Sequence, residues 1–211
     1  MRFIYLHGFA SSPESRKAVY LREASANLAI SLEVPDLNQG DFSHLTITRQ
    51  LSQLETILPQ DGTPVTLIGS SLGGLTSAWL GQRQSQVQRL VLLAPAFGFL
   101  DYWLPQLGET QLQQWQESGY LPVYHYSEER SLPLHYHFLE DARQYQTDEL
   151  LRVVPTLILH GRHDLTIPID ASRQYAKERS WVKLIELESD HSLSDVMPEI
   201  WQEIRNFCQL V

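Results

Sequence analysis

The sequence predicts an α/β fold built on a doubly wound, mostly parallel sheet of six strands. Short apolar runs alternate with helical stretches, which is typical of a parallel sheet covered by helices on both faces. The apolar runs are continuous, as expected for strands buried on both faces. The predicted strands span residues 3–6, 32–34, 65–68, 90–93, 156–160 and 184–187.

Five helices are expected between and after these strands. They span residues 15–25, 44–58, 72–84, 170–178 and 197–209. Ser43 suits the N-cap of the second helix and Asp170 the N-cap of the fourth, because both side chains accept backbone N–H groups well.

The composition fits one domain over residues 1–211. A hydrophobic fraction of 43% supplies a sizeable core. No apolar run approaches the roughly 20 residues that a membrane-spanning helix needs. The net charge of −9 disfavours contact with phosphate backbones. We therefore expect neither nucleic acid nor membrane as a partner.

The first residues and the cysteine content bear on compartment and cofactors. The apolar stretch before His7 is too short for a signal-peptide core, so a cytoplasmic location is expected. The single cysteine, Cys208, cannot form an intrachain disulfide, and no zinc-type spacing occurs. We expect no metal and no other cofactor.

One segment, residues 96–150, interrupts the alternation of strands and helices. It is rich in aromatic residues and prolines and longer than a parallel crossover requires. We interpret it as a lid or cap insertion within the same domain, with an antiparallel hairpin formed by 120–126 and 132–138. Its rings either line an apolar acyl or alcohol pocket or, as we favour for most of them, simply pack the insertion onto the sheet.

Ser71 is the candidate nucleophile. It is the central residue of a Gly-x-Ser-x-Gly pattern that follows an apolar strand and precedes a helix, which is the setting of a nucleophile elbow. Gly69 and Gly73 remove side chains that would clash in so tight a turn. Ser70 lacks this pattern of flanking glycines. A structural glycine-rich turn is the alternative.

His191 is the candidate general base. A serine hydroxyl needs an adjacent base, and histidine titrates near neutral pH. Of the eight histidines, His191 stands in the loop after the last predicted strand. In a doubly wound sheet this loop lies at the carboxyl edge, where ligand sites gather. The alternative is a solvated loop histidine.

Asp164 is the candidate acid of the triad. It follows the strand 156–160, which places it at the same edge. A carboxylate there fixes the tautomer of the histidine and stabilises the imidazolium. Asp190 adjoins His191 in sequence, where side chains rarely aim at each other. The order Ser71, Asp164, His191 matches that of Ser-Asp-His hydrolases.

The backbone N–H groups of Phe9 and Leu72 are the candidate oxyanion hole. Leu72 follows the nucleophile, and Phe9 lies in the turn after the first strand. Gly8 lets that turn approach closely. His7 is expected to support the turn rather than to act in catalysis.

These motifs resemble the α/β-hydrolase superfamily and, within it, small bacterial esterases of the YqiA type. The resemblance rests on the turn from Leu6 to Pro13 and the elbow from Ile68 to Gly74. It implies cofactor-free hydrolysis of short acyl esters, with Phe9 and Leu72 in the oxyanion hole. It also implies a strand order of 2-1-3-4-5-6 and the loss of the superfamily's first hairpin.

The leading hypothesis is therefore a carboxylic ester hydrolase that acts on a small acyl substrate through an acyl-enzyme. A peptidase, thioesterase or carbon–carbon bond hydrolase would use the same triad, because this fold hosts many chemistries. A non-catalytic ligand-binding protein is a third reading. A homodimer is left open.

Overall fold

The computed structural model describes residues 1–210 and contains a six-stranded parallel sheet. Its strands are β1 (Arg2–Leu6), β2 (Leu32–Glu33), β3 (Val65–Ser70), β4 (Val87–Leu93), β7 (Thr156–Gly161) and β8 (Val182–Leu187). They lie in the order β2-β1-β3-β4-β7-β8 and are all parallel, which confirms the predicted order.

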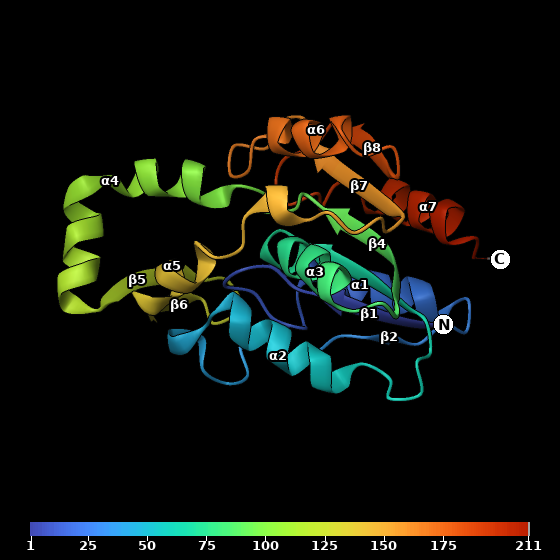
Figure 1. The fold of residues 1–211 in the computed structure, drawn as a ribbon, viewed down its shortest axis with the longest axis horizontal. Helices are drawn as coiled ribbons and strands as arrows, with labels where there is room; N and C mark the ends of the chain where they lie inside the picture. The colour runs from blue at the N-terminus through green and yellow to red at the C-terminus, as the bar shows by residue number, and fades with distance from the viewer. Residues whose placement is uncertain (211) are drawn as a thin grey trace.

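Helices cover both faces of the sheet (Figure 1). They are α1 (Arg16–Ala26), α2 (Ile47–Ile57), α3 (Leu72–Arg83), α6 (Ile169–Lys177) and α7 (Met197–Cys208). Apolar residues of α2, α3 and α6 form one core with one face of the strands, and those of α1 and α7 form a second core on the other face. The doubly wound architecture is thus as predicted.

Two predicted helix starts are wrong. Helix α2 is capped by Thr46, whose hydroxyl accepts the N–H of Arg49 at 3.0 Å, while Ser43 lies in a preceding 3-10 turn (Phe42–His44). Helix α6 begins at Ile169, so Asp170 lies in its first turn and pairs with Arg173 at 3.0 Å. Thr46 therefore caps α2 in place of Ser43, while α6 starts after Pro168 without a side-chain cap.

The chain between β4 and β7, here called the β4–β7 connection, contains a long helix that the sequence did not indicate. Helix α4 (Phe99–Ser118) includes Pro105 and bends at Gly108, where φ is 74°. Figure 1 shows α4 extending from the sheet and then turning sharply. A proline and a glycine within one helix obscure its pattern in the sequence.

The rest of the β4–β7 connection packs against the body of the protein. Strands β5 (Tyr120–His125) and β6 (Arg130–His135) form an antiparallel hairpin as expected, but its second strand was predicted over 132–138, and residues 137–138 instead begin α5 (His137–Ala142). The Asp141 carboxylate accepts the N–H groups of Ile47 and Thr48, at 2.7 and 3.1 Å, and so caps α2 from outside.

Most aromatic rings of the β4–β7 connection pack against one another. Trp115 is buried, and its indole N–H donates to the Leu134 carbonyl at 2.9 Å. Trp103 contacts Trp115 and Phe138, with ring centroids 5.6 and 6.1 Å apart. We expected most of these rings to pack the insertion onto the sheet, whereas many of them pack within the insertion itself.

None of the helices within residues 1–210 combines the length and the hydropathy needed to cross a bilayer.

Helix α3 lies so close to the end of β1 that a side chain at Gly73 has no room. A Cβ there would overlap the carbonyl oxygens of Leu6 and His7. A Cβ at Gly81, further along α3, would meet the flexible Leu90 methyl groups at 3.3 Å. Only glycine therefore fits at position 73, at the start of α3, whereas position 81 has room for a larger residue.

We expect Gly73→Ala to lower the free energy of unfolding by about 1–3 kcal/mol or more, because the backbone must shift to relieve the overlap. Gly81→Ala, the matched control, should change it by no more than about 1 kcal/mol, since alanine favours helix. Urea denaturation of both variants checks this. Equal unfolding midpoints for the two would contradict the packing argument.

Candidate active site

Ser71 occupies a strained turn between β3 and α3. Its φ of 53° and ψ of −118° are rarely adopted by a residue with a side chain. The turn is held by backbone hydrogen bonds: the Ser71 N–H donates to Leu93 at 2.9 Å, and its carbonyl accepts the N–H groups of Gly74 and Ala96 at 2.8 and 3.0 Å. The sequence pattern predicted such an elbow, and the backbone has this geometry.

Glycines permit the elbow. A Cβ at Gly69 would overlap the Gly73 carbonyl and the Ser77 hydroxyl. A Cβ at Gly8 would lie 3.3 Å from the Ser70 carbonyl oxygen, so the turn after β1 rests directly against the elbow. Gly8, Gly69 and Gly73 thus stand where backbone segments approach each other closely.

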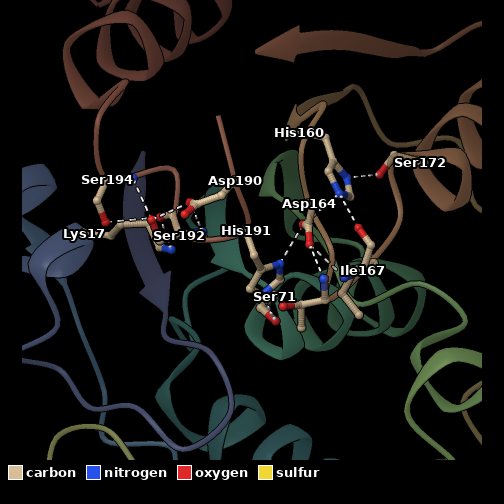
Figure 2. Close-up of polar contacts among 11 residues, drawn as sticks. Lys17, Ser71, His160, Asp164, Ile167, Ser172, Asp190, His191, Ser192 and Ser194 are labelled. Carbon is tan, nitrogen blue, oxygen red and sulfur yellow. Dashed lines mark hydrogen bonds and ion pairs between the residues drawn. The ribbon is translucent and has the colours of Figure 1, made fainter. Parts of the chain in front are cut away.

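The side chains of Ser71, His191 and Asp164, here called the candidate triad, form one hydrogen-bonded chain (Figure 2). The Ser71 Oγ lies 3.0 Å from Nε2 of His191. Nδ1 of the same ring lies 2.6 Å from Oδ2 of Asp164. Because a carboxylate only accepts, Nδ1 carries the proton and Nε2 faces the serine hydroxyl as an acceptor.

The His191 loop reaches Asp164 because Gly161, the last residue of β7, has no side chain. A Cβ there would overlap the carbonyl of Ser189. The loop also has internal ties: Asp190 accepts the N–H and O–H of Ser192 at 2.8 and 2.6 Å. Asp190 is therefore hydrogen-bonded within its own turn, while Asp164 is the carboxylate that accepts from His191.

Asp164 is buried and fully hydrogen-bonded. Its Oδ1 accepts the N–H groups of Thr166 and Ile167, each at 2.8 Å. Its Oδ2 accepts from His191 and also from Nε2 of His160, at 3.1 Å. Burial by itself would raise the pKa of Asp164, but the bonds from His160, His191 and the backbone hold it well below its usual value. The carboxylate is ionised at neutral pH.

The candidate oxyanion donors belong to two segments that adjoin Ser71. Leu72 is the first residue of α3, whose opening N–H groups have no partner within the helix. Phe9 follows Gly8 in the turn that rests on the elbow. Within residues 1–210 neither N–H has a hydrogen-bond acceptor. Their role as oxyanion donors stays a prediction.

His7 is buried beneath the turn that carries Phe9. Its Nδ1 donates to the Gly8 carbonyl at 2.9 Å, and its Nε2 accepts the N–H of Leu37 at 3.0 Å. Burial lowers its pKa, against the pull of the Gly8 carbonyl and Asp36. A neutral ring bonded at both nitrogens supports the turn, and no contact joins it to the candidate triad.

Two residues of this region went unnoticed in the sequence. His160, at the end of β7, contacts Asp164. Lys17, on α1, donates to the Ser192 carbonyl at 2.7 Å and so ties α1 to the His191 loop (Figure 2). The position of a histidine directly after the apolar run 157–159 was a usable signal for His160. Nothing in the sequence marked the second.

Comparisons with known proteins agree with the fold. Residues 2–209 match the model of the uncharacterised protein family UPF0227. An Agrobacterium vitis S4 protein described as a hydrolase is similar, with 24% identity, 98% of this chain and 87% of that chain covered, and a TM-score of 0.85. Mouse alpha/beta hydrolase domain-containing protein 10 is similar at 22% identity and a TM-score of 0.81, with 98% of this chain and 89% of that chain covered. Est1E from Butyrivibrio proteoclasticus, with ferulic acid bound, has 19% identity, the same coverages and a TM-score of 0.80.

Lys17 provides a test of the packing between α1 and the His191 loop. Burial lowers its pKa to about 8, against the attraction of Asp190 and Asp164. Lysine in an unfolded chain titrates near about 10.4. Between these two values the unfolded state binds more protons, so the free energy of unfolding rises with pH across that window.

We therefore expect the stability of the wild type to increase relative to Lys17→Met as pH rises from about 8 to 10. Subtracting the variant cancels the other groups that titrate in this range. Urea denaturation at several pH values measures the difference. A difference that stays constant, or that shrinks as pH rises, would show that Lys17 is not buried in this way.

Proposed function

The chain belongs to the UPF0227 family and has the α/β-hydrolase fold, and from its candidate triad we propose that it is a serine hydrolase cleaving carboxylic esters of small acyl substrates. One observation carries the proposal. The Ser71 hydroxyl, at a strained elbow, lies 3.0 Å from a ring nitrogen of His191 whose other nitrogen lies 2.6 Å from a buried carboxylate.

The proposed reaction has two halves. Ser71 Oγ attacks the ester carbonyl carbon while Nε2 of His191 takes the hydroxyl proton. The negative charge that develops on the carbonyl oxygen is stabilised by the N–H groups of Phe9 and Leu72. The C–O bond to the alcohol then breaks, and His191 returns the proton to the departing alcohol.

The second half releases the acid. A water molecule gives a proton to His191 and attacks the acyl carbon, and Ser71 leaves with that proton. Asp164 remains ionised throughout and stabilises the imidazolium by its hydrogen bond to Nδ1. No step calls for a cofactor.

We also propose that the β4–β7 connection acts as a lid. Its chain leaves directly from the elbow, since Ala96 donates its N–H to the Ser71 carbonyl. Phe9 contacts Trp103 and Phe138 of this connection, with ring centroids 6.0 and 5.3 Å apart. These rings would place apolar surface beside the scissile ester and favour an apolar group on one side of it.

Hydrolysis of short-chain p-nitrophenyl esters tests the proposed activity. Ser71→Ala should lower kcat/KM by ~10³-fold or more, because the nucleophile is lost. Ser70→Ala is the matched control, since it removes the same group one residue earlier in the chain, and it should keep activity within about tenfold. Equal loss in both variants, or equal slow hydrolysis by the wild type and Ser71→Ala, would count against the proposal.

The pH dependence tests the role of His191. Its ring must be neutral to accept the serine proton, so kcat/KM should rise as pH increases from the acidic to the neutral range. The lowered pKa of Asp164 keeps this carboxylate ionised over the whole range, so one ascending limb is expected. A flat profile would exclude His191 as the base.

A further inference from the structure

His160 is a fully buried histidine outside the candidate triad that touches it. It lies near the carboxyl end of β7, and its side chain and that of Asp164 are both inaccessible to solvent. Buried polar groups are costly unless each is hydrogen-bonded. The ring has a hydrogen-bond partner at each nitrogen, and these partners determine which nitrogen carries the proton.

The surroundings of the ring determine where its proton sits. Nε2 faces two groups that only accept, the Ile167 carbonyl at 2.9 Å and Oδ2 of Asp164 at 3.1 Å. It therefore carries a hydrogen. Nδ1 lies 2.8 Å from the Ser172 hydroxyl of α6, which can donate to it. Figure 2 shows the ring beside Asp164, on the side away from Ser71.

The contact falls on the oxygen that His191 uses. Oδ2 of Asp164 receives hydrogen bonds from both histidines, and Oδ1 receives two from the backbone. An ionised carboxylate has about four acceptor positions, so every one is filled. The carboxylate has one orientation, and its basicity toward His191 is reduced by the second donor.

We propose that His160 is a positioning residue that orients the Asp164 carboxylate and sets how strongly it stabilises the protonated form of His191. The chain of contacts runs from Ser172 through His160, Asp164 and His191 to Ser71. The inference rests on the proposed function, because it concerns the base of the proposed reaction. The other charges that face this carboxylate are Lys17 on α1 and Asp190 in the His191 loop.

Removing the hydrogen bond from His160 should shift the pH profile of kcat/KM in one direction only. Without it, Oδ2 carries more negative charge and stabilises the imidazolium of His191 more strongly. The base then stays protonated to a higher pH, so the ascending limb of kcat/KM moves upward. Loss of orientation also lowers the maximal rate, since small displacements of catalytic groups are costly. A residue that only filled space would not move the pH profile.

Two variants of similar size separate these roles. The side-chain nitrogen of glutamine can occupy the place of Nε2, so His160→Gln keeps the donor to Asp164. The shorter amide of His160→Asn reaches only the place of Nδ1 and loses that donor. We expect His160→Asn to lower kcat/KM about tenfold or more and to shift its ascending limb upward by about 0.5 pH unit. His160→Gln should restore the wild-type limb and a rate within about threefold of wild type.

The inference is overturned if both variants fold and keep the wild-type pH profile, or if both lose activity equally with an unmoved limb. Circular dichroism establishes folding. If neither folds, Ser172→Ala decides, since it leaves the ring in place but removes the donor to Nδ1. It should shift the limb upward by a smaller amount, and an unmoved limb would then refute the proposal.

Failure of the proposed function would give a different result from failure of the role of His160. In that case the wild type shows no Ser71-dependent hydrolysis, and no pH profile exists to compare. If the wild type is active and the His160 and Ser172 variants keep its rate and pH profile, the role of His160 is overturned but the proposed function is not.

Discussion

The candidate site depends on two close approaches between backbone segments at the carboxyl edge of the sheet. The start of α3 rests on the end of β1, and the His191 loop rests on the end of β7. Both contacts exist only because Gly73 and Gly161 have no side chains. A Cβ at either position would separate groups that must lie within hydrogen-bonding distance.

This packing also accounts for the strain at Ser71. A residue with φ of 53° costs of order 1–3 kcal/mol and persists only when its surroundings hold it. Here the Ser71 N–H and carbonyl are both hydrogen-bonded, and α3 behind it is largely buried. The strain directs the hydroxyl outward toward His191, away from its own helix.

Electrostatics complete the arrangement. Burial would favour a neutral Asp164, yet four hydrogen-bond donors keep it ionised. Two of these donors are backbone groups of the loop after β7, so the fold itself supplies two of the four hydrogen bonds. The remaining two are histidines, and only one of them reaches Ser71.

Much of the fold could be predicted from the sequence because strands buried on both faces leave unbroken apolar runs. The elbow around Ser71 could be predicted because glycine spacing and chain order both carry information. Helix α4 could not, since Pro105 and Gly108 interrupt its pattern. The contact between His160 and Asp164 was missed for another reason. The direction of a side chain at a strand end depends on tertiary packing. The structure does bring Ser71, His191 and Asp164 together as the sequence led us to expect.

Mapping a covalent adduct tests the central claim most directly. A fluorophosphonate reacts with a serine that an adjacent base activates, and peptide mass spectrometry locates the modified residue. We predict a single adduct on Ser71 in the folded protein, none on Ser70, and none after prior unfolding in denaturant. An unmodified Ser71 in folded protein, or modification spread evenly over several serines, would contradict the account.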